Sequence, residues 1–245
     1  MKNVTHPLVI ILICCLAAAA CGRQPDYQEL TRLSSELAQK GKFEEAGRLA
    51  RQALKTVRET VPGDSPDLIQ PLNTVAALFT TLGQYAMAES LYVELLAMDE
   101  KHLGKDHFIV ARDLNNLGAT YRAMGRYEQA EPMLQRSVKI CEQVRGPNHP
   151  DVLNPLFNLA ELYEAQQMPD RIAAVYERIL TIYEEILGRD SQDLAPILED
   201  MADFYRSADM PERAAELIAR AGEISAGQPS GQTSGQPSEQ PSDQP

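Results

Sequence analysis

The sequence predicts an all-α protein built as a solenoid of antiparallel helix pairs. The main observation is a residue pattern that recurs every 42 residues along most of the 245-residue chain. The triplets Gly41-Lys42-Phe43, Gly83-Gln84-Tyr85 and Gly125-Arg126-Tyr127 occupy the same place in three successive segments. Between these triplets, apolar residues recur at spacings of three and four, the period of an α-helix. A long internal repeat of helical segments is typical of solenoids, in which each unit buries its apolar face against its neighbours.

One repeat is interpreted as two helices joined by a tight turn. In the clearest copy, Leu114 and Leu117 lie on one face of the first helix, and the pattern stops at Gly125. It resumes with Ala130 on the face of the second helix. Gly118 and Ala130 are both small, which predicts a close approach of the two helices where they cross.

The pattern Leu114-x-x-Leu117-Gly118-x-x-Tyr121, followed by Ala130-x-x-x-Leu134, resembles the tetratricopeptide repeat. Together with the segments 125–131 and 146–152, it is similar to the longer repeat of kinesin light chains and many bacterial proteins. The match covers about five units. This resemblance implies a right-handed superhelical solenoid over residues 27–224, whose concave face binds a protein or an extended peptide.

Four Asx residues also recur every 42 residues, each just before an expected first helix: Asp64, Asp106, Asn148 and Asp190. Their side chains are expected to cap the free N–H groups of the helix starts. Pro71 and Pro155 conflict with these starts, because a proline inside a helix costs about 3 kcal/mol. We therefore expect these two helices to begin later or to kink.

The last two units depart from the pattern. Gln167-Met168-Pro169 and Asp209-Met210-Pro211 replace the Gly-x-Tyr turn, and Ile172 replaces the small Ala of the second helix. The fifth unit also lacks the long extension of its second helix. It is expected to be the C-terminal cap of the solenoid.

The N-terminus has the layout of a signal peptide over residues 1–20, with Lys2 followed by an apolar run and small residues. The segment Ala18-Ala19-Ala20-Cys21-Gly22 resembles the lipobox of bacterial lipoproteins. This resemblance implies a lipid on Cys21, a lipid-bearing linker over residues 21–26, and a periplasmic location with Gly22 favouring the outer membrane. Cleavage after Ala20 to release a secreted or soluble periplasmic protein is the alternative.

The C-terminal residues 225–245 change to Gly, Gln, Pro and Ser, which predicts a disordered tail. The formal net charge of −12 argues against binding to nucleic acid and against electrostatic attachment to anionic lipid. If Cys21 carries lipid, Cys141 has no cysteine partner in the mature chain, and we expect it to be a buried apolar residue.

No motif for catalysis or metal binding is found. His107 and His149 lie 42 residues apart, so their spacing belongs to the repeat and indicates a structural role. The chain contains no HExxH or CxxC pair, no GxxxxGK[ST] loop and no Gly-x-Ser-x-Gly elbow. The sequence predicts a protein that is not an enzyme and that needs no metal, cofactor or small-molecule substrate.

The resemblance implies that partner contacts come from non-core positions of the first helices. The chosen partner-binding residues are Asn73, Arg112, Asn115, Arg122, Phe157 and Glu161. The same face is expected to include Thr31, Ser35, Ala77, Glu164, Glu199 and Asp203. It changes from neutral, through a basic middle, to an acidic end. Phe157 is the best anchor, because a buried aromatic ring contributes strongly to binding. The alternatives are ordinary solvated polar residues and, for Phe157, packing in the core.

These observations favour a non-catalytic scaffold tethered to the membrane, which binds a protein or extended peptide within a bacterial envelope assembly. The alternative is a structural envelope protein that assembles with copies of itself as a homo-oligomer. Neither the partner nor the pathway follows from the residues.

Overall fold

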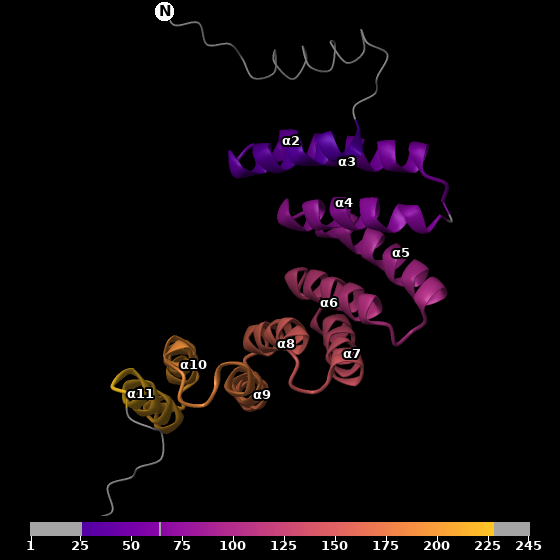
Figure 1. Ribbon diagram of the computed structural model, residues 1–245. Coiled ribbons are helices and arrows are strands. Elements are labelled where there is room, and N and C mark those ends of the chain that lie inside the picture. The colour runs from indigo at the N-terminus through magenta and orange to yellow at the C-terminus, as the bar shows by residue number, and fades with distance from the viewer. Residues whose placement is uncertain (1–25, 64, 228–245) are drawn as a thin grey trace, which may run out of the picture. The chain divides into compact units, whose positions relative to one another are not determined.

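The computed structural model describes residues 26–63 and 65–227, and all regular structure in these ranges is helical (Figure 1). The chain divides into two compact units, with the boundary between Arg145 and Gly146. The predicted signal peptide, Cys21 and all but the first residues of the predicted tail lie outside the described ranges. Within those ranges, no helix has both the length and the apolar character that crossing a membrane requires.

The described part of unit 1, residues 26–63 and 65–145, consists of three helix pairs and one short 3-10 helix. The pairs are α2 (Tyr27–Gln39) with α3 (Phe43–Thr60), α4 (Ile69–Thr81) with α5 (Tyr85–Leu103), and α6 (Phe108–Ala123) with α7 (Tyr127–Arg145). The 3-10 helix η1 (Pro66–Leu68) leads into α4. The members of each pair pack against each other, as the ribbon shows for α6 and α7 (Figure 1).

Unit 2 contains two further pairs. These are α8 (Leu153–Ala165) with α9 (Pro169–Leu187), and α10 (Ala195–Ser207) with α11 (Pro211–Ser225). The 3-10 helices η2 (Pro150–Val152) and η3 (Gln192–Leu194) precede α8 and α10. Helix α11 has 15 residues where α9 has 19, so the last second helix is short, as predicted.

Each pair turns at the predicted glycine because the backbone there is left-handed. Gly41, Gly83 and Gly125 have φ angles of 74°, 67° and 72°. A Cβ atom added at any of the three would meet nothing within 4 Å. The positive φ angle, which glycine adopts without a steric penalty, is therefore what favours glycine at these turns.

Unit 2 makes the same turn without glycine. Gln167 and Asp209 stand 42 and 84 residues after Gly125, and their φ angles are 56° and 59°. Asp visits this conformation more readily than Gln, because its short side chain can hydrogen-bond to nearby backbone. Pro169 and Pro211 then begin α9 and α11, where the preset φ of proline suits the first helical position.

The capping side chains stand one residue later than predicted, and three of the four cap the 3-10 helix that precedes the first α-helix of the repeat. The observed acceptors are Ser65 Oγ, His107 Nδ1, His149 Nδ1 and Ser191 Oγ, each bonded to the backbone N–H two residues on. The predictions for Asp106, Asn148 and Asp190 are therefore wrong, because each precedes the capping residue. The predicted cap Asp64 lies outside the described residues. The capping role of His107 and His149 accounts for their 42-residue spacing.

The two prolines that conflicted with the predicted helix starts lie in the first turns of their helices. Helix α4 begins at Ile69 and α8 at Leu153, so Pro71 and Pro155 are each the third helical residue. The N–H groups of the first turn have no partner within the helix, so a proline there breaks no helical hydrogen bond. The later helix start, preceded by a 3-10 turn, is the option that the structure adopts.

Gly118 allows α6 and α7 to approach closely. A Cβ atom at Gly118 would lie 2.7 Å from Leu134 Cγ and 2.8 Å from its Cδ2 atom. Ala130, the other small residue of this crossing, is fully buried. The predicted reason for the small residues is thus confirmed for this pair. Cys141 on α7 is also buried, with 3% of its surface exposed.

Candidate partner-binding surface

The predicted residues in unit 1 lie on α4 and α6 but differ in accessibility. Arg112 is exposed, whereas Asn115 is buried, with only 5% of its surface exposed. Asn73 is half-buried, and its Oδ1 atom is enclosed without a hydrogen-bond partner among the described residues. Arg122 is half-buried near the end of α6. On this helix, Arg112 is therefore the most accessible of the three chosen residues.

The predicted residues in unit 2, Phe157 and Glu161, are four positions apart on α8. Phe157 is 39% exposed and Glu161 is also exposed. Residues with this spacing are neighbours on a helix surface. Phe157 therefore presents part of its ring to the outside, next to a carboxylate, instead of being enclosed in the core.

A hollow of about 340 Å³ lies between the first helices α2 and α4 of unit 1, with the apolar residues Ala77 and Leu78 in its lining. Thr31 and Ser35 line it from α2, and Thr74 and Thr81 from α4. All four hydroxyls donate hydrogen bonds to backbone carbonyls of their own helices, at 2.9 to 3.0 Å. The hollow thus has polar walls whose hydroxyl protons are already used.

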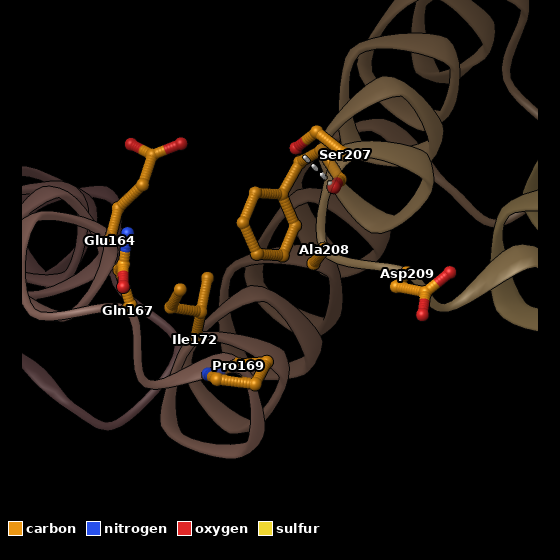
Figure 2. Close-up of a pocket in the computed structure, with 8 residues that line it drawn as sticks. Glu164, Gln167, Pro169, Ile172, Ser207, Ala208 and Asp209 are labelled. Atoms are coloured by element: carbon orange, nitrogen blue, oxygen red, sulfur yellow. Dashed lines mark hydrogen bonds between the residues drawn. The ribbon is translucent and has the colours of Figure 1, made fainter.

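A second pocket, in unit 2, has an apolar floor. Its volume is about 360 Å³, and eight residues from α8, α9, α10 and the adjoining turns line it: Glu164, Gln167, Pro169, Ile172, Phe204, Ser207, Ala208 and Asp209. Ile172 and Phe204 are buried in its floor, whereas Glu164 and Asp209 are exposed. In Figure 2, the Glu164 and Asp209 side chains lie on opposite sides of Ile172.

Carboxylates dominate the electrostatics beside this pocket. The Tyr176 ring packs against Phe204, with ring centroids 4.6 Å apart. Burial raises the pKa of Tyr176, and the negative charges of Glu164, Glu161 and Asp200 raise it further. The surroundings of the Phe204 ring therefore carry negative charge.

Unit 1 also contains two buried carboxyl groups that the sequence analysis missed. Asp99 on α5 and Asp113 on α6 are 1% and 0% exposed. Burial raises the pKa of Asp113 to about 8, the adjacent Asp99 carboxyl raises it too, and Arg112 opposes both effects. Two close carboxyls in a low-dielectric interior cannot both ionise cheaply, so this pair retains a proton at neutral pH.

The repeat register contained a signal for this pair. Asp113 stands at the position that Pro71 and Pro155 occupy in other repeats, and Asp99 stands at that of Cys141. These equivalents are apolar or weakly polar and buried. A charged residue at a register position where the neighbouring repeats bury proline or cysteine is the feature that would have indicated the pair.

Ion pairs between second helices recur in both units. Arg136 on α7 pairs with Glu100 on α5, and Arg220 on α11 pairs with Glu184 on α9. Arg136 and Arg220 also donate to the carbonyls of the loops that enter their own repeats, at Lys105 and Arg189, as Arg178 does at Pro147. In the first repeats, the order is reversed, because Arg58 on α3 pairs with Glu94 on α5.

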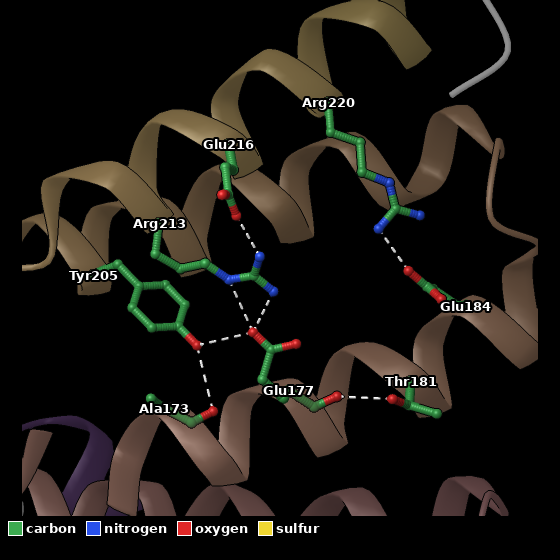
Figure 3. Close-up of polar contacts among 8 residues, drawn as sticks. All are labelled: Ala173, Glu177, Thr181, Glu184, Tyr205, Arg213, Glu216 and Arg220. Carbon is green, nitrogen blue, oxygen red and sulfur yellow. Dashed lines mark hydrogen bonds and ion pairs between the residues drawn. The ribbon is translucent and has the colours of Figure 1, made fainter. Parts of the chain in front are cut away.

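A denser cluster joins α9, α10 and α11 (Figure 3). Arg213 contacts both Glu177 and Glu216, and the Tyr205 hydroxyl donates to the Ala173 carbonyl at 3.3 Å. These contacts hold α10 and α11 against α9. They therefore support the helices that form two walls of the unit 2 pocket.

The described ranges hold no group of three or more His, Cys, Asp or Glu side chains placed to bind a metal ion. The predicted binding face consists of apolar floors and charged or amide side chains on helix surfaces. Such surfaces are suited to recognising another polypeptide.

Paired helices in a 42-residue register define a helical-repeat scaffold, a class of protein that presents extended surfaces to partners. The family model of the tetratricopeptide repeat matches residues 30–101 and 109–185, which is more than half of the chain. The chain belongs to the tetratricopeptide repeat family. This fold is a scaffold for protein–protein interaction, and its members are generally non-catalytic.

Solved structures show the same fold. BtubC (BKLC) from P. vanneervenii is 22% identical, with 89% of this chain and 85% of that chain covered and a TM-score of 0.63. A putative kinesin light chain with nearly identical repeats from Podosopora anserina is also 22% identical, with 82% and 95% covered and a TM-score of 0.66. MamA from Desulfovibrio magneticus RS-1 is 17% identical, with 84% and 99% covered and a TM-score of 0.50. No curated protein matches the sequence.

Proposed function

We propose that this protein is a non-catalytic scaffold that binds an extended peptide or a protein surface along its first helices. The observation that carries this proposal is the partly exposed Phe157 ring beside Glu161 on α8. An aromatic ring on a polar helix surface buries substantial area when a partner covers it. Membership of the family supports the class of function, and Phe157 and Glu161 are the residues that we propose contact the partner.

The proposal includes a membrane tether. The residues around Cys21 resemble a lipobox, so a lipid on this cysteine would hold the solenoid at the periplasmic side of a bacterial envelope membrane, with the outer membrane favoured. Multiple acyl chains give stable anchoring, whereas one chain gives only marginal binding. We expect the scaffold to act in an envelope assembly, and release as a soluble periplasmic protein is the alternative.

Phe157→Ala tests the binding surface. Wild-type and variant proteins are used to capture partners from detergent-solubilised envelopes of the source organism. We expect at least one protein that the wild type captures to be lost with Phe157→Ala. The control is Phe43→Ala on α3, because Phe43 is 56% exposed but belongs to a second helix. Equal capture by wild type and both variants would contradict the proposal.

Mass spectrometry of the mature N-terminus tests the tether. We expect the first residue to be an acylated Cys21 and the protein to remain with the membrane fraction. Cys21→Ser should leave the protein unlipidated and shift it out of that fraction. An unmodified Cys21 in the wild type would refute the anchor but leave the scaffold proposal standing. Mass measured in dilute solution separately tests self-assembly.

A further inference from the structure

The unit 2 pocket combines an apolar floor with acidic edges. Ile172 is 3% and Phe204 9% exposed, so their side chains close the floor. Pro169 lies below Ile172 in Figure 2, while Glu164 and Asp209 stand at either side. A volume of about 360 Å³ is at the lower end of the range for ligand pockets, about 300–1,000 Å³. This size suits one long side chain.

Several residues that line this pocket are those by which unit 2 departs from the repeat. Gln167 and Asp209 replace turn glycines, and Ile172 replaces the Ala that stands at residue 130 in unit 1. Glycine would offer no side chain to the pocket at either turn. The left-handed backbone is kept in both places. Part of the pocket lining therefore comes from substitutions that keep the left-handed turn of the helix pair.

The pocket has a negative charge that nothing within it neutralises. Glu164 and Asp209 are charged lining residues, and none of the eight lining residues is basic. Three basic residues belong to the same helices but make other contacts. Arg171 lies 5.3 Å from the Tyr163 ring centroid, Arg178 donates to the Pro147 carbonyl at 2.7 Å, and Arg206 bonds to Asp203 at 2.7 Å. A cation entering from outside would complete the charge balance.

We propose that this pocket binds one Arg or Lys side chain from an extended segment of the partner protein. The methylene stem packs on Ile172 and Pro169, and the charged end lies between the Glu164 and Asp209 carboxylates. The Phe204 ring adds a cation–π contribution, of about 0.5–2 kcal/mol in proteins generally. This inference rests on the proposed scaffold function and names the chemistry of one contact.

The occupant is expected to come from another polypeptide. Residues 228–245 of this chain contain no Lys or Arg, so they cannot supply the cation. The formal net charge of −12 also favours the approach of a basic segment. Long-range attraction steers such a segment to the surface, and the pocket selects the side chain.

The test uses the intact protein and two labelled nonapeptides, Gly-Ala-Leu-Ala-Arg-Ala-Leu-Ala-Gly and the same peptide with citrulline in place of Arg. Citrulline keeps the shape of the side chain but removes its charge. Fluorescence anisotropy measures both affinities at low salt. We expect the Arg peptide to bind at least about tenfold more tightly, because the charge is partly desolvated in the pocket.

The variant Glu164→Gln/Asp209→Asn should abolish this preference. Asn at residue 209 tolerates the left-handed backbone, so the turn is retained. The matched control is Asp193→Asn/Glu212→Gln, which removes the same charge from two exposed positions of unit 2 outside the pocket. Circular dichroism confirms that both variants are folded. We expect the control to keep the preference for Arg.

Equal binding of the two peptides to the wild type would overturn the inference. An equal loss in the control would do so as well, because net charge would then explain the effect. The scaffold proposal has its own readout in the Phe157-dependent capture. If capture of a partner needs Phe157 but not the two pocket carboxylates, the pocket assignment alone is refuted. If capture does not depend on Phe157, the scaffold proposal is refuted, whatever the peptide affinities show.

Discussion

The two units build the same helix pairs with different turns and different surfaces. Unit 1 turns at Gly125 and its equivalents, whereas unit 2 turns at Gln167 and Asp209 with the same left-handed backbone. The hollow in unit 1 is lined by hydroxyls bonded to their own helices and by the basic residue Arg32, whereas the pocket in unit 2 is lined by the acidic residues Glu164 and Asp209 over an apolar floor. The repeat thus determines the conformation of the backbone. The side chains that differ between the units stand at positions where this conformation accepts more than one residue type.

The interiors differ as well. Unit 1 buries the Asp99 and Asp113 carboxyls, whereas the residues 84 positions later in unit 2, Tyr183 on α9 and Ile197 on α10, carry no carboxyl group. A proton is therefore part of the folded structure of unit 1. This contrast leads to the largest expected effect of the four below.

Asp113→Asn should change how stability depends on pH. The folded pKa of about 8 lies above the ordinary value of about 3.9, so the folded state binds more protons between these limits. Stability should fall as the pH rises from about 4 to 8, by up to about 1.4 kcal/mol per pH unit. Asn carries no titrating proton, so urea unfolding at pH 5, 7 and 9 should show a flatter profile and a more stable variant at pH 9.

The groups that face Asp113 are the Asp99 carboxyl, the Arg112 guanidinium and the Tyr92 ring. The matched control is Asp106→Asn, because Asp106 is exposed nearby. This control should keep the wild-type slope. A pH profile that Asp113→Asn leaves unchanged would show that the buried pair holds no proton.

Gly118→Ala should destabilise unit 1 by about 1–3 kcal/mol, because the added methyl group would overlap the Leu134 side chain. Ala160 occupies the same register position in unit 2. The reverse change, Ala160→Gly, should cost about 1 kcal/mol through lower helix propensity. Thermal unfolding measures both. A neutral Gly118→Ala would mean that the α6–α7 crossing relaxes easily.

Exchanging the turn residues should move stability in opposite directions. Gly125→Ala places a Cβ on a left-handed residue and should cost about 1–2 kcal/mol. Gln167→Gly relieves that strain but raises the conformational entropy of the unfolded chain. We therefore expect the free energy of unfolding to rise by less than about 1 kcal/mol. Urea unfolding midpoints measure the pair. If Gln167→Gly destabilises the protein, contacts of the Gln side chain outweigh the backbone strain.

The ion pairs between second helices should have the smallest effects. The Arg58 and Glu94 side chains are 40% and 30% exposed, whereas Arg220 and Glu184 are 19% and 16% exposed. Arg58→Gln should therefore cost about 0.5 kcal/mol and Arg220→Gln about 1 kcal/mol. The reversal Arg58→Glu/Glu94→Arg should recover most of the stability that Arg58→Glu loses. Calorimetric unfolding at low and high salt checks whether Arg220→Gln loses more stability than Arg58→Gln.

The fold could be predicted from the sequence because the repeat gives independent evidence for each helix pair. The 42-residue period located the turns, the tight crossing at Gly118 and the short final helix. The same period could not distinguish Asp106 from His107, since both positions recur with it and only hydrogen-bond geometry decides which one caps. A register also assigns a face but not a depth, which is why Asn115 is on the expected helix yet buried. The unit 2 pocket depends on side chains from three helices, so its shape required coordinates.

The arginines that reach back to their own entry loops make each of the last three repeats a self-contained module. Arg136, Arg178 and Arg220 each donate to a carbonyl 31 residues earlier, in the loop that opens the same repeat. A duplicated 42-residue segment would therefore carry both halves of this latch with it. Gene duplication or loss could change the number of repeats without leaving an entry loop untied. The number of repeats can then change during evolution, while the hydrogen bond from the arginine to the entry loop is kept in each copy.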